Sequence, residues 1–192
     1  MPSVSSKAIS VLIILSVMGK VIESFPNGAP SDTCVKKRPN QPNHGQARPQ
    51  PLHTNPFEVV ASSESYHPGQ EISVVVYPHT KQELFRGFFI QARDADTNEW
   101  IGEWVKSENT NTIPECAAIT HGDNKDKLAA KLIWKAPQNK RGRVYFTYRE
   151  DNMKENSLWA QEEFMTPFRS GTVLQSYGTF WSDIIGKVQQ HS

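Results

Sequence analysis

Residues 84–93 read Leu84-Phe85-Arg86-Gly87-Phe88-Phe89-Ile90-Gln91-Ala92-Arg93, and this run predicts the central β-strand of the fold. The run is short and rich in aromatic residues, which favours a strand over a helix. Side chains on a strand alternate between two faces. One face would carry Phe88, Ile90 and Ala92, and the other would carry Phe85, Phe89, Gln91 and Arg93. Because both faces carry apolar bulk, we expect both to be covered, with Gly87 allowing a neighbour to approach closely.

Alternating apolar residues on either side of this run predict further short strands separated by Gly, Pro and Asn turns. The predicted strands are 57–61, 71–77, 84–93, 100–104, 116–120, 127–135 and 143–149. In the range 127–135 the inward-facing residues would be Leu128, Ala130, Leu132 and Trp134. About seven short strands of this kind predict an all-β protein with an antiparallel β-sandwich.

The first 24 residues have the layout of a secretory signal peptide, because Lys7 precedes an apolar run over 8–18 that is too short to span a bilayer comfortably. We place the cleavage site between Ser24 and Phe25, with Gly19 as an alternative. No second long apolar run follows, so we expect a secreted, extracellular chain without a transmembrane segment after cleavage. Residues 166–192 form a tail whose apolar residues fit one face of a short amphipathic helix over 180–188, although Gly186 disfavours it.

The charge of the chain is nearly balanced, with 21 Lys and Arg against 20 Asp and Glu. Cleavage would remove Lys7, Lys20 and Glu23, which leaves equal numbers of basic and acidic residues. A neutral chain of this kind argues against nucleic-acid binding. The two cysteines, Cys34 and Cys116, are expected to pair in an exported chain, and two free thiols are the alternative.

An ordered series of motifs resembles the reeler (reelin-type) domain family over about residues 25–165. The series begins with Phe25-Pro26-Asn27-Gly28-Ala29-Pro30, Cys34 and His44-Gly45, and continues with Tyr66-x-Pro68-Gly69-Gln70 and Phe85-Arg86-Gly87-Phe88-x-Ile90-Gln91-Ala92-Arg93. It ends with Cys116-x-x-x-Thr120-His121, Lys125, Trp134-x-Ala136-Pro137 and Gly142-x-Val144-x-Phe146. Each motif is weak alone, but the order is specific.

This resemblance implies an immunoglobulin-like β-sandwich with a disulfide-anchored N-terminal arm. The single-domain layout is similar to the secreted "putative defence protein" branch of arthropods. That branch implies binding of microbial surface polymers, lipopolysaccharide or glucan, with the haemocyte surface as a further partner and promotion of haemocyte aggregation. The alternative is an extracellular-matrix adhesion module that binds host glycosaminoglycan.

No enzyme motif, cofactor motif or metal-ligand spacing is visible, so we expect neither an enzyme nor a bound cofactor or metal. His121 is expected to be a hydrogen-bonded turn residue, with a ligand contact or a metal ligand as the alternative.

The first candidate binding surface is a basic arm without acidic residues, which carries Lys36, Lys37, Arg38 and Arg48. The second is a basic hairpin with Lys135, Lys140, Arg141 and Arg143. Lys and Arg clusters suit the phosphates and sulfates of microbial or host polymers, although a merely solvated surface is the alternative for the arm. Trp100 and Trp104 are candidates for stacking on sugar rings, and at least one of them is expected in the core.

Overall fold

The computed structural model describes residues 25–34, 47–146, 171–176, 178–184 and 186–189. Its described elements are twelve strands and three short 3-10 helices. The strands are β1 (Phe57–Ala61), β2 (Ser65–Tyr66), β3 (Glu71–Pro78), β4 (Gly87–Asp94), β5 (Glu103–Val105), β6 (Thr110–Ile113), β7 (Ala118–His121), β8 (Ala130–Lys135), β9 (Gly142–Phe146), β10 (Gly171–Ser176), β11 (Thr179–Ile184) and β12 (Gly186–Val188). The 3-10 helices are η1 (Ser31–Cys34), η2 (Leu52–Thr54) and η3 (Pro114–Cys116).

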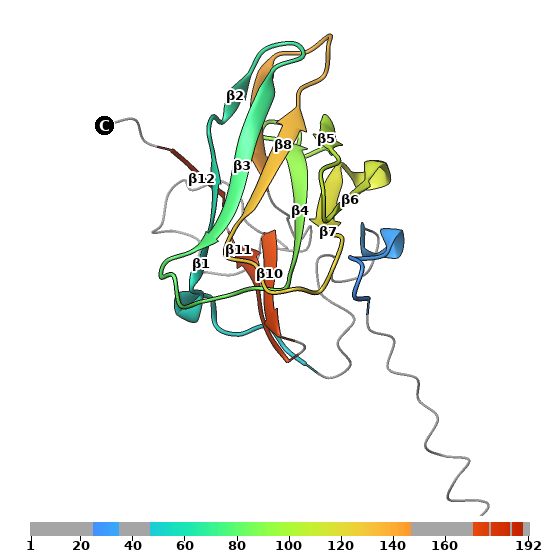
Figure 1. The fold of residues 1–192 in the computed structure, drawn as a ribbon. Coiled ribbons are helices and arrows are strands. Elements are labelled where there is room, and N and C mark those ends of the chain that lie inside the picture. The colour runs from blue at the N-terminus through green and yellow to red at the C-terminus, as the bar shows by residue number, and fades with distance from the viewer. Residues whose placement is uncertain (1–24, 35–46, 147–170, 177, 185, 190–192) are drawn as a thin grey trace, which may run out of the picture.

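The strands form two sheets (Figure 1). One is a 5-stranded sheet in the order β12-β1-β3-β8-β5, and the other is a 7-stranded sheet that follows the order β11-β10-β4-β7-β6. Strand β9 also pairs with β4, and β2 pairs with β9. Every described pairing is antiparallel except that of β12 with β1. The predicted all-β, antiparallel β-sandwich is therefore confirmed, with the parallel pair of β12 and β1 as an addition that was not predicted.

The core lies between the two sheets because each sheet directs alternate side chains inward. Strands β3 and β8 contribute Val74 and Leu132, while β4 contributes Phe88 and Ile90 from the facing sheet. Burying such a side chain stabilises the fold by roughly 1.5–3 kcal/mol. Trp134 is 0% exposed and packs edge-on against Phe146, with ring centroids 5.7 Å apart.

The central position of β4 is confirmed, since all eight of its residues are buried and it pairs with β7, β9 and β10. One face points into the main core through Phe88, Ile90 and Ala92. On the other face Phe89 packs in a second, smaller cluster with Cys34 and Cys116. Both faces are thus covered, as the sequence predicts.

Phe85 differs from the prediction that placed it with Phe89. It precedes β4 and forms an isolated bridge with Lys127. Its ring lies in the main core, 6.4 Å from the ring of Phe88 and 5.6 Å from that of Phe57. Strand alternation does not extend across the boundary at Gly87, so the two-residue period placed Phe85 on the wrong face.

The C-terminal tail contradicts the expected amphipathic helix, because its residues form β10, β11 and β12. Strand β10 pairs with β4, with Val173 opposite Phe88, and a hairpin then leads into β11. Phe180, Trp181 and Ile184 are buried by this pairing rather than by a helical face. The sandwich therefore continues to Val188, beyond the predicted domain end at residue 165.

Strand ends also differ from the predictions. Strand β8 begins at Ala130, so Leu128 lies outside it and is 55% exposed instead of facing inward. Strand β5 begins at Glu103 rather than at Trp100. The predicted signal peptide and the last residues, 147–149, of the predicted strand 143–149 lie outside the described residues. Among the described residues, no helix is long and apolar enough to cross a membrane.

Candidate functional site

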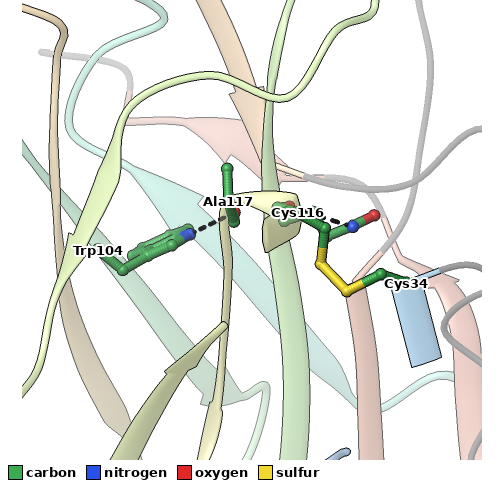
Figure 2. Close-up of a disulfide and its surroundings, with 5 residues drawn as sticks. Cys34, Trp104, Cys116 and Ala117 are labelled. Carbon is green, nitrogen blue, oxygen red and sulfur yellow. Dashed lines mark hydrogen bonds between the residues drawn. A yellow bond between two sulfur atoms is a disulfide. The ribbon is translucent and has the colours of Figure 1, made fainter. Parts of the chain in front are cut away.

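A disulfide between Cys34 and Cys116 fixes the N-terminal arm to the outer side of the 7-stranded sheet (Figure 2). The two Cα atoms are 6.0 Å apart, although the cysteines are 82 positions apart in sequence. Next to the bridge, the Gln91 amide donates to the carbonyl of Cys116 at 3.3 Å, and the Trp104 indole donates to the carbonyl of Ala117 at 2.8 Å. The predicted pairing and the anchored arm are therefore present.

The basic arm starts directly after this anchor. Lys36, Lys37 and Arg38 lie outside the described residues, whereas Arg48 is described and exposed. Two residues after Arg48, the backbone N–H of Gln50 donates to the carbonyl of Phe180 on β11 at 2.8 Å. The chain on either side of the arm is thus attached to the 7-stranded sheet.

Beyond the C-terminal end of β4, the basic hairpin between β8 and β9 meets the turn after β4. The Lys140 ammonium donates to the Asp94 carboxylate at 2.7 Å, and the Arg143 guanidinium donates to Asp96 at 2.8 Å. Within the described part of the chain, Lys135 and Arg141 are exposed and have no ion-pair partner. Two of the four predicted hairpin cations are therefore already neutralised.

Asp94 organises this turn. Burial acts to raise the pKa of its carboxyl, but hydrogen bonds from Lys140 and from the backbone N–H groups of Thr97 and Asp96 outweigh burial and lower the pKa. Both backbone donors lie 2.9 Å from Asp94 Oδ1. The hydrogen bond to Asp94 in turn raises the pKa of Lys140.

We expect Asp94→Asn to destabilise the protein at neutral pH by about 1–3 kcal/mol, because a charged acceptor of three hydrogen bonds is lost. The folded-state pKa lies below the unfolded value, so the carboxylate stabilises the fold above the unfolded pKa. That stabilisation disappears as the pH falls through the folded-state pKa. Urea unfolding at several pH values should therefore show a difference between wild type and Asp94→Asn that shrinks in acid.

Asp96→Asn is the matched control, because its pair with Arg143 is exposed on both sides (56% and 66%). Exposed pairs of this kind contribute about 0–1 kcal/mol. Equal effects of the two substitutions at neutral pH would contradict the organising role of Asp94.

The two candidate tryptophans have different environments. Trp104 is 7% exposed and packs against Phe146, so it belongs to the core. Trp100 is 42% exposed, and the Arg93 guanidinium carbon lies 5.6 Å from its ring centroid. Arg93 is itself held by a 2.7 Å hydrogen bond to the carbonyl of Asn98. Trp100 is therefore the candidate with a ring accessible to a ligand.

A cavity of about 340 Å³ lies beside the hairpin, lined by Gly102, Glu103, Lys135, Ala136, Pro137 and Gln138. Its lining combines a carboxylate, an ammonium group and an amide with apolar Ala136 and Pro137. Sequence analysis identified Lys135 but missed the other groups, because they come from β5 and from the hairpin and meet only after folding.

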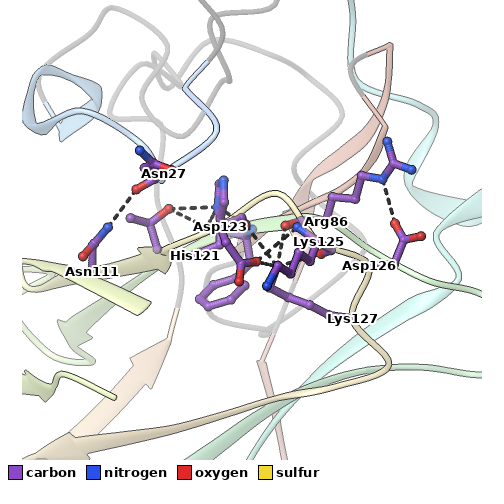
Figure 3. Close-up of polar contacts among 10 residues, drawn as sticks. Asn27, Arg86, Asn111, His121, Asp123, Lys125, Asp126 and Lys127 are labelled. Atoms are coloured by element: carbon purple, nitrogen blue, oxygen red, sulfur yellow. Dashed lines mark hydrogen bonds and ion pairs between the residues drawn. The ribbon is translucent and has the colours of Figure 1, made fainter. Parts of the chain in front are cut away.

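His121 is hydrogen-bonded, as expected, but it is the last residue of β7, beside the N-terminal end of β4, and not a turn residue (Figure 3). Its Nδ1 is 3.2 Å from both the backbone nitrogen and the carbonyl oxygen of Phe88. Burial is the main cause that lowers the pKa of His121, and hydrogen bonds with the backbone of Phe88 and, to a smaller extent, of Phe25 oppose this. The neighbouring Thr120 hydroxyl donates to the Phe88 carbonyl at 2.8 Å and accepts from the N–H of Ala29 at 3.1 Å.

Lys127 closes the loop that follows His121. Its ammonium donates to the Asp123 carboxylate at 2.7 Å and to the carbonyls of Lys125, Arg86 and Asp123 at 2.8, 3.0 and 3.1 Å. The group is saturated by the protein and has a structural role. No cluster of three or more His, Cys, Asp or Glu residues suited to a metal ion occurs within the described ranges.

The model of the reeler domain matches residues 32–161 of the chain. Among curated relatives, "Putative defense protein 3" of Antheraea mylitta is 31% identical over 140 residues, covering 71% of this chain and 81% of the relative. "Putative defense protein" of Bombyx mori is 27% identical with the same coverage, 71% and 81%. "Putative ferric-chelate reductase 1" of Danio rerio is 25% identical over 66% of this chain but only 22% of its own length.

A crystal structure of the human F-spondin reeler domain aligns with 76% of this chain and 88% of its own, with 16% identity and a TM-score of 0.46. The family model covers more than half of the chain, and the Antheraea mylitta relative aligns over most of its length. The chain therefore belongs to the reeler domain family.

Proposed function

We propose that this protein is a secreted defence protein that binds microbial surface polymers, lipopolysaccharide or glucan, and promotes haemocyte aggregation. The supporting observation is its similarity to insect proteins named as defence proteins, which extends over 81% of the length of two of them. The matched ferric-chelate reductase shares with this chain about a fifth of its length, so it does not support a reductase activity here.

The basic arm is the surface that we propose for an anionic polymer. Between Val35 and Phe57 the sequence has no acidic residue, so the charges of Lys36, Lys37, Arg38 and Arg48 are not offset within this stretch. The Cys34–Cys116 bridge and the Gln50–Phe180 hydrogen bond attach the chain on both sides of the arm. Attachment reduces the entropy that a binding segment loses on binding.

The hairpin has a weaker claim to an anionic ligand. Asp94 and Asp96 neutralise Lys140 and Arg143, and Glu71 and Glu103 are the cross-strand neighbours of Lys135. The local charge is therefore balanced, and a phosphate or sulfate gains less there than at the arm. This charge distribution is the physical reason to place the anionic ligand on the arm.

Replacing Lys36, Lys37, Arg38 and Arg48 with Ser should weaken binding to lipopolysaccharide by roughly tenfold or more, since about 1.4 kcal/mol of lost charge-assisted contacts suffices. Wild-type binding should also weaken as NaCl rises from about 50 to about 300 mM, because salt screens exposed charges. Binding to immobilised lipopolysaccharide, to insoluble glucan and to heparin is the measurement. Haemocyte aggregation with each variant tests the cellular step.

The competing variant is Lys135→Ser/Arg141→Ser, which leaves the Asp94–Lys140 pair intact and so preserves the fold. Loss of binding in this variant alone would move the site to the hairpin. Binding that ignores salt and both sets of substitutions would instead favour Trp100, tested by Trp100→Ala. Binding to heparin alone would support the matrix adhesion alternative and contradict the defence role.

A further inference from the structure

The cavity of about 340 Å³ lies where β5 and β8 meet, at one edge of the 5-stranded sheet (Figure 1). One wall consists of Gly102 and Glu103, where β5 begins, and the other consists of residues 135–138, where β8 ends and the hairpin follows. Antiparallel pairing brings the two walls together, with Glu103 directly opposite Lys135. The pocket therefore follows from the register of two strands and not from a single loop.

Trp134 fixes the wall on the β5 side from beneath. Its indole donates to the carbonyl of Ile101 at 3.0 Å. Gly102 has a φ of +69°, and a Cβ atom there would lie 2.4 Å from the Trp134 ring, so only glycine fits this position. Because Trp134 is 0% exposed, its ring supports the pocket but presents no face to a ligand.

The wall on the β8 side is attached to the turn between β2 and β3. The backbone N–H of Ala136 donates to the carbonyl of Gln70 at 2.8 Å, and the N–H of Gly69 donates to the carbonyl of Pro137 at 3.1 Å. The side-chain amide of Gln138 lies against Gly69, where a Cβ atom would be 2.8 Å from the amide oxygen. Both walls thus have their shape before a ligand arrives, which lowers the entropic cost of binding.

The polar side chains of the pocket are those of Glu103, Lys135 and Gln138, and all three residues are exposed. Within the part of the chain that the structure describes, none of the three makes a side-chain hydrogen bond or an ion pair. The Glu103 carboxylate and the Lys135 ammonium are therefore more than 4.0 Å apart, although the two residues lie directly opposite each other. An exposed ion pair stabilises a fold very little, so a ligand that enters between the two groups displaces little.

The two opposite charges select the charge of the ligand. Glu103 repels a purely anionic group, and Lys135 repels a purely cationic one. A group that carries one positive and one negative charge side by side matches both side chains. The lining residues include no aromatic side chain on which a sugar ring could stack, whereas Ala136 and Pro137 suit a short aliphatic part.

We propose that this pocket binds the α-amino-acid end of a ligand, in which one carbon atom carries both an ammonium group and a carboxylate. The ammonium group of the ligand donates to the Glu103 carboxylate, and the Lys135 ammonium donates to the carboxylate of the ligand. The gap between Glu103 and Lys135 accommodates this end. The volume agrees with a small ligand, because ligand pockets range from about 300 to about 1,000 Å³.

Two sources present such an end. One is a free amino acid, and the other is a cell-wall peptide in which a diamino acid, such as diaminopimelic acid, keeps one of its two α-amino-acid ends unsubstituted. Only the second source rests on the function proposed above, to which it would add a further kind of microbial polymer. Binding of the amino-acid end itself requires neither the basic arm nor that function.

Alanine is the smallest probe of the pocket. Titration of the isotope-labelled mature protein with about 0.1–20 mM alanine should shift the backbone amide NMR signals of Gly102, Glu103 and Gln138, with a dissociation constant of about 1 mM. N-acetylalanine lacks the ammonium group and alaninamide lacks the carboxylate, so each should bind about tenfold or more weakly. Glu103→Gln and Lys135→Gln should each weaken alanine binding by a similar factor.

Glu71→Gln is the matched control. Glu71 is exposed and lies opposite Lys135 on the other side, on β3, but it does not line the pocket. The variant should bind alanine like wild type. Equal weakening by Glu71→Gln and Glu103→Gln would overturn the proposal, because the charge of the whole row would then matter and not the pocket. The absence of saturable shifts at about 20 mM, or equal binding of alanine and N-acetylalanine, would overturn it as well.

A soluble cell-wall peptide that contains diaminopimelic acid separates the two sources. If it shifts the same signals as alanine and its N-acetylated form does not, the pocket recognises the polymer. If alanine binds and the peptide does not, the site is one for free amino acids, which supports the pocket and contradicts the polymer as its source. The arm variant with four Ser replacements should bind alanine like wild type, so failure of the pocket and failure of the arm are distinguishable.

Discussion

Cys34→Ser/Cys116→Ser should lower the free energy of unfolding by about 4 kcal/mol. The bridge joins residues separated by 82 positions, and a cross-link over a loop of that length restricts the unfolded chain by about 4.5 kcal/mol in the chain-entropy model. Cys34 is 6% exposed and Cys116 is 0% exposed, so the two hydroxyls also replace buried sulfur. Urea unfolding of wild type and variant under oxidising conditions gives the difference.

Reduced wild type separates the cross-link from the effect of serine. If the bridge acts through the unfolded chain, unfolding of wild type in excess dithiothreitol should show nearly the same loss as the double variant. A loss below about 1 kcal/mol in both would mean that packing of η1 against η3 holds the arm without the bridge. Wild type should yield a Cys34–Cys116 peptide in non-reducing mass mapping, whereas two alkylatable thiols would contradict the bridge.

The sequence predicted the parts of the fold that depend on local alternation. The run that contains β4 has apolar side chains on both faces, and both faces are covered in the structure. The opposing sheet covers one face, and the N-terminal arm that ends at Cys34 contributes to the cover of the other. Strands β1, β3 and β8 alternate between buried and less buried residues over most of their length. Two cysteines in a chain that is expected to be exported were sufficient to predict the bridge. The resemblance supplied the sandwich type.

The predictions failed where two periods fit the same residues. Phe180, Trp181, Ile184 and Val188 match helical spacing, yet strands with register shifts between β10 and β11 bury three of them. Strand β4 had an open edge, and β10 pairs along it. This pairing satisfies the backbone N–H and C=O groups of both strands, whereas a separate helix would satisfy only its own. No local pattern shows that edge, because it belongs to a strand more than 80 residues away in sequence.

Charge clusters in the sequence do not show which of their side chains form ion pairs in the folded protein. Lys140 and Asp94 are 46 residues apart, and Arg143 and Asp96 are 47 apart, so their pairing follows from the β4–β9 register and not from local sequence. In the same way, Trp100 and Trp104 have similar local sequences, but only Trp104 lies in β5 and points into the core. The number of basic side chains predicted from sequence as ligand-binding candidates therefore exceeds the number that the structure leaves available to a ligand.

Gly87→Val should destabilise the fold by about 3 kcal/mol, at the upper end of overpacking effects. A Cβ atom at Gly87 would lie 2.8 Å from Cε1 and 3.1 Å from Nδ1 of His121. The ring has no room to retreat, because Nδ1 lies 3.2 Å from the backbone nitrogen of Phe88 and 3.2 Å from the Thr120 hydroxyl. Thermal and urea unfolding measure the loss, and Gly178→Ala is the control, since nothing lies within 4 Å of a Cβ there.

A second variant identifies the imidazole as the cause. His121→Ala alone should destabilise by removing a buried ring and its hydrogen bonds, but in the Gly87→Val background the same deletion makes space for the valine. The double variant should therefore be more stable than the sum of the two single losses predicts, by about 1 kcal/mol or more. Additive losses, or a Gly87→Val protein with an unchanged melting midpoint, would show that His121 does not limit this face of β4. In that case the N-terminal arm before Cys34 would be held at this end of β4 without a steric limit from His121. The backbone of Phe25 hydrogen-bonds to His121, and the backbone of Ala29 hydrogen-bonds to Thr120.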